Sequence, residues 1–107
     1  MLKRVKGWLL PIAIFAMITN APRADEHSYS PANGFVPDVA TAVAIAEAIL
    51  IPIYGRAQVE AERPFSASLM DGSWTVLGHL KTGHVGGVTL IVIQKSTGRI
   101  LRVTHGR

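Results

Sequence analysis

The stretch FSASLMDGSWTVLGHL, residues 65–80, alternates apolar and polar side chains on both sides of a two-residue turn. Before the turn, apolar residues occupy every second position, which is the period of a strand with one buried face. Asp71-Gly72 forms the turn, because this pair tolerates the positive φ angles of a tight hairpin. The return strand reaches Leu80 and is interrupted by Gly78. The stretch therefore predicts a β-hairpin.

A second hairpin pattern follows in residues 88–105. Its first half, VTLIVI at 88–93, is a nearly unbroken apolar run, typical of a central strand that is covered on both faces. A turn follows at KSTG, where Gly98 suits a left-handed conformation. The final strand is predicted at 99–105, and KTGHVGG at 81–87 is the loop between the hairpins. The pattern predicts four antiparallel strands in sequence order.

A strongly apolar helix is predicted before the strands, in PDVATAVAIAEAILIPIYG at residues 37–55. Apolar residues recur there at helical spacing. Asp38 is positioned to cap the free backbone N–H groups of the first turn. Glu47 is the only charged residue between Asp38 and Arg56. The apolar surface of the helix is therefore wide and must be covered by the sheet.

The end of this helix is predicted from Pro52 and Gly55. Proline lacks a backbone N–H and crowds the preceding turn, so the helix should kink or end near Ile51. Gly55 then acts as its stop. Residues 56–63, RAQVEAER, are predicted to form a short helical turn or a loop, with their glutamates on a solvated face.

The order of elements predicts one α+β domain, in which a single N-terminal helix packs on a curved four-stranded antiparallel sheet. A length of 107 residues leaves room for one domain. The chain has no cysteine, so no disulfide stabilises it and the apolar core must suffice. The predicted core residues are Val43, Ile45, Ala46, Ile49, Leu50, Ile53, Phe65, Leu69, Trp74, Val76, Leu90, Val92 and Leu101.

The N-terminus follows the pattern of an export signal. Basic residues near the start precede an apolar run at 8–18, and small residues follow it. We expect a signal peptide at 1–24 cleaved after Ala24, or else an uncleaved N-terminal anchor. Residues 25–36 are polar and predict a flexible arm, and 37–107 form the folded domain. The expected location of the protein is periplasmic or extracellular.

The net charge of +4 belongs to this leader. Four of the 11 Lys and Arg residues lie in the first 24 positions, and all seven acidic residues follow them. The part of the chain after the leader is therefore close to neutral. It lacks the basic footprint of a nucleic-acid-binding protein, and we expect membrane contact only through the leader.

The ionisable residues give no sign of a catalytic or metal site. None of the four histidines has the spacing of a zinc motif, and a metal site would need His79, His84 and His105 to converge. No serine has the histidine and acid neighbours of a nucleophile. Glu47 lies either on an exposed stripe of the helix or in a buried pair, with Arg99, Arg102 or a basic group of a partner as its counter-ion. We expect no enzyme, no cofactor and no metal.

Eight short pieces between residues 35 and 107 resemble, in order, the bacterial immunity proteins with a nuclear-transport-factor-2-like fold. The pieces are FVPD at 35–38, AIAEAIL at 44–50, IYG at 53–55, PF at 64–65, DGSWTV at 71–76, GGV at 86–88, GRIL at 98–101 and HGR at 105–107. The resemblance implies a cystatin-like arrangement, in which a curved sheet grips the helix. It is a reduced version of the fold, because full domains of this type usually have more helices.

This resemblance also implies a function. Such proteins bind and neutralise a cognate toxin of a polymorphic toxin system without catalysis, and the leader would place this event in the cell envelope. The candidate partner-binding residues are Lys81 and His84, in the loop between the hairpins, and His79 and Arg102, on the outer face of the sheet.

Two other functions stay open from the sequence alone. Cystatin-like sheets often form a cone with an apolar pocket, so the chain could be a small periplasmic ligand-binding or enzyme-like domain with Glu47 in that pocket. It could also be an envelope inhibitor module that binds peptides by strand addition at an edge of the sheet.

Overall fold

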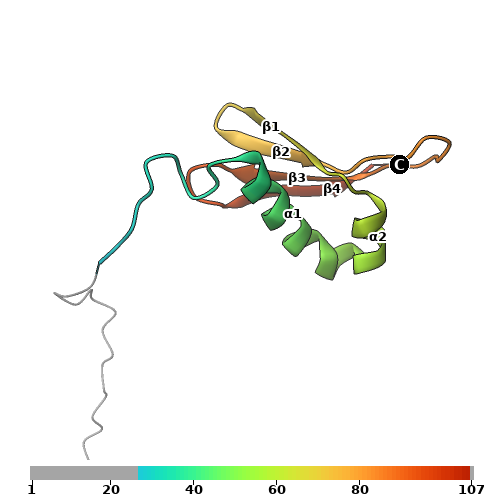
Figure 1. Cartoon of the computed structure of the whole chain (residues 1–107), viewed down its shortest axis with the longest axis horizontal. Coiled ribbons are helices and arrows are strands. Elements are labelled where there is room, and N and C mark those ends of the chain that lie inside the picture. Colours follow the sequence, from blue (N-terminus) through green and yellow to red (C-terminus); the bar gives the residue numbers. More distant parts are fainter. Residues whose placement is uncertain (1–26, 107) are drawn as a thin grey trace, which may run out of the picture.

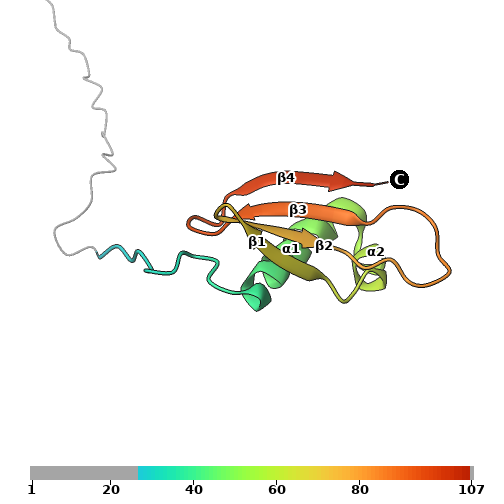
Figure 2. The ribbon, with the colours of Figure 1, turned by 90° about the horizontal axis from the view of Figure 1, so that it is seen from above.

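The computed structural model describes residues 27–106. Its elements are α1 (Val39–Tyr54), α2 (Arg56–Ala61), β1 (Ser66–Met70), β2 (Ser73–Leu77), β3 (Thr89–Gln94) and β4 (Ile100–His105). The strands form one antiparallel sheet in the order β1-β2-β3-β4. α1 crosses one face of this sheet, and α2 follows it (Figures 1 and 2). The predicted α+β fold, with a helix packed on a four-stranded antiparallel sheet, is confirmed.

α1 begins at the predicted cap. The backbone of Asp38 is extended, with a φ of −145°. Its carboxylate accepts hydrogen bonds from Oγ1 of Thr41, at 2.6 Å, and from the Thr41 backbone N–H, at 2.8 Å. The hydroxyl bond and then the backbone bond lower the pKa of Asp38, because both favour the ionised carboxylate. The cap prediction is confirmed.

α1 ends later than the sequence predicts. The helix continues to Tyr54 with Pro52 inside its last turn, so the predicted end near Ile51 is wrong. A proline removes one backbone hydrogen bond, but the last turn is still closed by the N–H of Gly55, which donates to the carbonyl of Ile51 at 2.8 Å. Gly55 has a φ of +93° and stops the helix as predicted. The short helical turn predicted next is α2.

The first hairpin turn has the predicted geometry. Asp71 and Gly72 have φ angles of +52° and +77°, both in the left-handed region that a two-residue hairpin requires. β1 and β2 pair directly across this turn. The return strand is shorter than predicted, because β2 ends at Leu77 and Leu80 lies outside the sheet.

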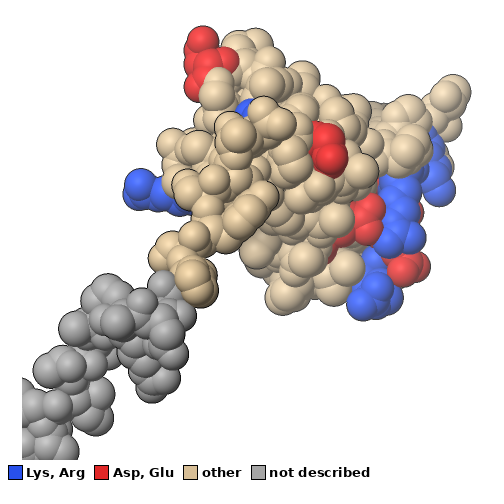
Figure 3. Space-filling view, turned by 60° about the vertical axis from the view of Figure 1, so that its left-hand side comes forward, with Lys and Arg blue, Asp and Glu red and all other residues tan. Residues whose placement is uncertain are grey.

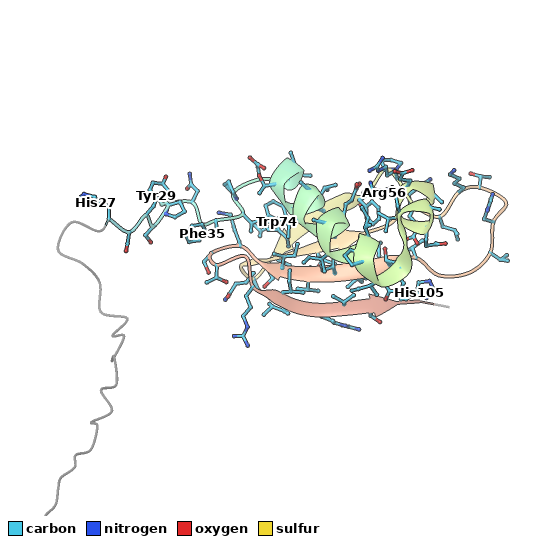
Figure 4. All side chains as sticks on the ribbon, turned by 90° about the horizontal axis from the view of Figure 1, so that it is seen from below. His27, Tyr29, Phe35, Arg56, Trp74 and His105 are labelled. Atoms are coloured by element: carbon cyan, nitrogen blue, oxygen red, sulfur yellow. The ribbon has the colours of Figure 1, made fainter. Side chains whose placement is uncertain are left out.

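The core lies between α1 and the inner face of the sheet. The Trp74 side chain lies between them (Figure 4), and its indole N–H donates to the carbonyl of Val36 at 2.8 Å. The buried apolar residues are Val36, Ala42, Ala46, Leu50, Val59, Phe65, Trp74, Val76, Ile91 and Ile93. Among these, the predictions for Ala46, Leu50, Phe65, Trp74 and Val76 are confirmed, and the predicted residues Val43, Ile45 and Ile49 are half-buried against this core.

The predicted orientation of β3 is wrong. Ile91 and Ile93 are buried against α1, and Ile91 pairs with the buried Val76. Leu90 and Val92, which were predicted in the core, are half-buried on the opposite face. No helix within residues 27–106 covers that face, so the strand is not covered on both sides (Figures 1 and 2). A continuous apolar run gives no alternation from which the buried face could be chosen.

A β-bulge changes the orientation of β4. The register with β3 shifts between Val92 and Ile93, and Leu101 is the extra residue. Leu101 is therefore about half exposed, and its predicted place in the core is wrong. Ile100, before the extra residue, and Val103, after it, both pack against the core.

Two further residues predicted in the core, Ile53 and Leu69, are also about half exposed. The buried positions of α1 recur every four residues up to Leu50, and this spacing continues to Tyr54 rather than to Ile53. Leu69 lies on β1, an edge strand that has a neighbour on one side only.

The last residues of the predicted flexible arm belong to the fold. The N–H of Phe35 donates to the carbonyl of Ser96 at 3.2 Å, and the N–H of Val36 donates to that of Lys95 at 3.0 Å. Val36 is fully buried. The boundary predicted at residue 37 therefore lies too late. Gly34 is needed beside this contact, because a Cβ there would collide with the Lys95 carbonyl.

The predicted signal peptide, residues 1–24, lies outside the described residues. Within the part of the chain that the structure describes, neither helix combines the length and the apolar character needed to span a bilayer.

Candidate functional site

Residues 78–88, which connect β2 to β3, project beyond the end of the sheet (Figures 1 and 2). We call this segment the 78–88 loop. Val85 in this loop is 95% exposed. Gly83 and Gly86 have φ angles of +84° and +114°, which residues with a side chain rarely adopt. The glycines thus shape a loop that presents an apolar side chain to solvent.

The base of the 78–88 loop is held by Glu62, a carboxylate only 4% exposed. Its Oε1 accepts from the backbone N–H of Thr89, at 2.8 Å, and from Thr89 Oγ1, at 3.0 Å. Its Oε2 accepts from Nε2 of Gln58 at 2.6 Å, and its backbone carbonyl accepts from the N–H of His79 at 2.7 Å. Glu62 therefore joins the end of α2 to the start of β3 and fixes where the loop leaves the sheet.

The sequence does not predict this role for Glu62, since Glu60 and Glu62 were both predicted on a solvated face. That prediction is confirmed for Glu60 and wrong for Glu62. The one sign of this contact in the sequence was Gly78, because a glycine that interrupts a strand indicates the close approach of another group. A Cβ at Gly78 would collide with Oε1 of Glu62. The pattern shows that some group approaches, but not which one.

A cavity of about 270 Å³ lies between α2 and the 78–88 loop. Its lining combines apolar side chains with a carboxylate, an amide and basic groups. The lining residues are Gln58, Ala61, Glu62, His79, Leu80, Lys81, His84, Val85, Gly87 and Val88. We call it the loop cavity.

The structure brings together three of the four residues predicted to bind a partner. Lys81 and His84 line the loop cavity, and so does His79, whose predicted place on the outer face of the sheet is wrong because β2 ends at Leu77. Arg102 does not, because it is exposed on β4, where it pairs with Val92 on the face of the sheet opposite α1. The candidate site is therefore the 78–88 loop with its cavity, and Arg102 belongs to a separate surface.

Glu47 makes an ion pair with Arg63. Nη2 of Arg63 lies 2.6 Å from Oε1 of Glu47, and its Nε lies 3.2 Å and 3.1 Å from the two carboxylate oxygens. These hydrogen bonds raise the pKa of the guanidinium. The Glu47 side chain is 18% exposed, so it lies neither on an open stripe nor against Arg99 or Arg102, the partners predicted within the chain. Glu47 also lines neither of the two cavities described here.

The histidines do not converge on a metal site. Within residues 27–106, no group of three or more His, Asp or Glu side chains is arranged to hold a metal ion. His105 instead lies beside Tyr54 at the end of α1, with ring centroids 5.6 Å apart (Figure 4). His79 and His84 remain together at the loop cavity.

A second cavity, of about 290 Å³, lies at the opposite end of the sheet, where the two hairpin turns meet residues 32–34. The ammonium group of Lys95, which lines it, binds the carbonyl of Asn33. Asp71 and Gly72 line it as residues of the turn. The ammonium group of this cavity thus already serves the fold.

Charged side chains are sparse on the face shown in Figure 3. Most of that face is formed by uncharged residues, and Lys and Arg side chains lie at its margins. Such a face offers no basic track for a nucleic-acid backbone.

Comparison with known proteins supports the predicted family. The family model described as NTF2 fold immunity protein matches residues 41–107. The uncharacterized protein YhhH of Escherichia coli (strain K12) is 35% identical over 83 residues, which are 77% of this chain. The chain spans 65% of the length of that relative. No solved structure matches significantly. The chain belongs to the NTF2 fold immunity protein family.

Proposed function

We propose that the chain binds one cognate bacterial toxin through the 78–88 loop and neutralises it, without catalysis, in the cell envelope. Membership of an immunity protein family supports toxin immunity in general. The observation that carries the finer proposal is the loop itself, which projects from the sheet and gathers His79, Lys81 and His84 around one cavity. Loops held on a rigid scaffold are where binding residues concentrate.

The composition of the loop suits a protein interface. Val85 offers an apolar contact that is almost fully exposed, and the cavity beside it can receive a side chain of the partner. Interfaces obtain most of their affinity from a few such pockets and the groups that fill them. Glu62 holds the base of the loop through Thr89 and the N–H of His79, so the loop leaves the sheet at a defined position before the partner arrives.

Absence of catalysis is proposed because the chain belongs to a family of immunity proteins. Two carboxylates of the fold also have structural partners: Glu47 is paired with Arg63, and Glu62 accepts three hydrogen bonds.

Location in the envelope is proposed from the export pattern of residues 1–24. Fusion of the whole chain to an alkaline phosphatase reporter tests this, because the enzyme is active only after export. Active reporter is expected for the chain and inactive reporter for a variant with Lys3, Arg4 and Lys6 changed to glutamate. Activity that does not depend on this change would contradict the export proposal.

Binding is tested with a candidate toxin domain chosen from the genes next to the one that encodes this chain. Titration calorimetry on the purified pair should give a one-to-one complex. Replacing His79, Lys81 and His84 together by alanine should weaken it at least about 100-fold, as for residues at the centre of an interface. Arg99→Ala is the matched control, since Arg99 is also charged and exposed but lies in the turn before β4. Equal loss in both variants would contradict a role of the loop.

A further inference from the structure

We propose that the loop cavity is an anchor pocket for an arginine side chain of the toxin, with Glu62 as the counter-ion of its guanidinium. The identity of the occupant rests on the proposed function. The pocket itself is argued from the contacts of Glu62 and can be tested without the toxin.

Glu62 has a buried carboxylate that makes no ion pair with a basic side chain of the fold. It is 4% exposed, and its carboxylate accepts only from the neutral groups of Thr89 and Gln58. Among residues 27–106, the ion pairs are Arg56–Glu60 and Glu47–Arg63. Buried carboxylates are costly unless a cation compensates them. A carboxylate that lines a cavity can receive that cation from outside.

The carboxylate of Glu62 can accept one more hydrogen bond than it receives in the structure. Its Oε1 receives two hydrogen bonds, whereas Oε2 receives one, from Gln58. A carboxylate oxygen accepts two. All three present bonds are donated to Glu62. The remaining site on Oε2 fits one N–H of a guanidinium.

The side chains that line the cavity suit an arginine side chain. Ala61, Leu80 and Val88 provide apolar surface for the aliphatic part of an arginine side chain. Arginine suits such a place because its guanidinium is weakly hydrated and is the preferred partner in buried ion pairs. The other ionisable groups that line the cavity are His79, Lys81 and His84. Lys81 opposes a bound cation, so its neutralisation should strengthen binding of an isolated arginine probe.

The pocket is tested first with N-acetyl-L-arginine amide as a probe. The isotope-labelled 107-residue chain, purified in the form in which the cell accumulates it, is titrated and followed by NMR at the Thr89 amide and the Gln58 side-chain amide. Saturable shifts are expected for the wild type and none with the neutral N-acetyl-L-glutamine amide. Absence of saturable shifts with the arginine probe would overturn the proposal.

Two matched variants assign the effect to the charge of Glu62. Glu62→Gln retains the shape of the side chain: its carbonyl oxygen still accepts from Thr89, and the amide of Gln58 turns over to accept from the new NH2 group. Glu60→Gln removes a charge from the same helix at an exposed position outside the cavity. The probe should bind to Glu60→Gln and not to Glu62→Gln. Equal binding of the probe to both variants would overturn the proposal that Glu62 is the counter-ion in this pocket.

The affinity of the toxin for Glu62 variants then tests whether an arginine of the toxin fills the loop cavity. Glu62→Gln should weaken the complex at least about 30-fold, the loss typical when one member of a buried charge pair is removed. Glu60→Gln should leave it unchanged. A toxin that binds the wild type and Glu62→Gln equally would overturn the pocket and leave the proposed function intact. A toxin that does not bind the wild type would contradict the proposed function, and the probe titration would then decide on the pocket alone.

Lys81 could itself turn inward and act as the resident cation of Glu62. Thermal unfolding separates this from the proposal. Lys81→Gln should leave the melting temperature unchanged, because Lys81 makes no ion pair with Glu62 in the structure. A clear drop in the melting temperature would show that Lys81 fills the pocket and would overturn the proposal.

Discussion

Gly78→Ala isolates the contact that fixes the 78–88 loop. Gly78 is not among the glycines with a positive φ, so alanine introduces no backbone strain there. Its Cβ, however, would lie 3.1 Å from both Cβ and Cδ of Glu62, and would collide with Oε1. The carboxylate must move, and its two hydrogen bonds with Thr89 then break.

The magnitude follows from those two bonds. A buried N–H of Thr89 left without a partner costs about 1–3 kcal/mol. Exchange of glycine for alanine by itself stabilises the fold by about 0.4–1 kcal/mol, because the unfolded chain becomes less flexible. The net loss of stability should be about 1–2 kcal/mol, which moves the urea midpoint down by roughly 1 M for a chain of this size.

The assay is urea unfolding of the whole chain followed by far-ultraviolet circular dichroism. The measurement includes Glu62→Ala and the double variant. The collision needs both side chains, so Gly78→Ala should destabilise the protein less when Glu62 is already alanine. The double variant should therefore lose at least about 1 kcal/mol less stability than the sum of the losses of the two single variants. A wild-type midpoint for Gly78→Ala, or strict additivity in the double variant, would refute the reasoning.

Three further predictions concern the core and the helix cap. Ile91→Ala should lose about 2–5 kcal/mol, whereas Leu90→Ala, on the opposite face of the same strand, should lose much less; similar urea midpoints would contradict the orientation of β3. Trp74→Phe leaves the carbonyl of Val36 without its donor and should lose about 1–3 kcal/mol in the same assay, and no loss would contradict the bond. The pKa of Asp38 is lowered in the fold, so its stabilising effect is complete above the ordinary aspartate value of about 3.9 and is lost as the pH falls below it. The melting temperature of Asp38→Asn should therefore fall less between pH 5 and pH 2.5 than that of the wild type, and equal falls would contradict the cap.

The fold could be predicted because its main signals are local. Asp38 caps α1 and Asp71-Gly72 forms the hairpin turn through the conformations of these residues alone. The buried face of β3 could not be predicted in the same way. Its residues are nearly all apolar, so only the pairing with β2 and α1 decides that Ile91 faces inward. The bulge at Leu101 likewise depends on a partner strand.

The site was predictable in part for the same reason. Lys81 and His84 stood out because a glycine-rich loop holds them close together in the sequence, whereas His79 was predicted on the outer face of the sheet. Glu62 did not, because its partner Thr89 is far along the chain and its segment has the composition of a solvated helix. Sequence reasoning found the loop but not the buried carboxylate that positions it.

The most direct test of the central claim is survival. A sensitive bacterial strain is made to produce the same candidate toxin domain, alone or together with the full-length protein. The account predicts that the wild type and Arg99→Ala restore growth and that the variant with alanine at positions 79, 81 and 84 does not, although all three accumulate to the same level. Full protection by the triple variant would contradict the proposed role of the 78–88 loop, and no protection by the wild type would contradict neutralisation of that toxin itself.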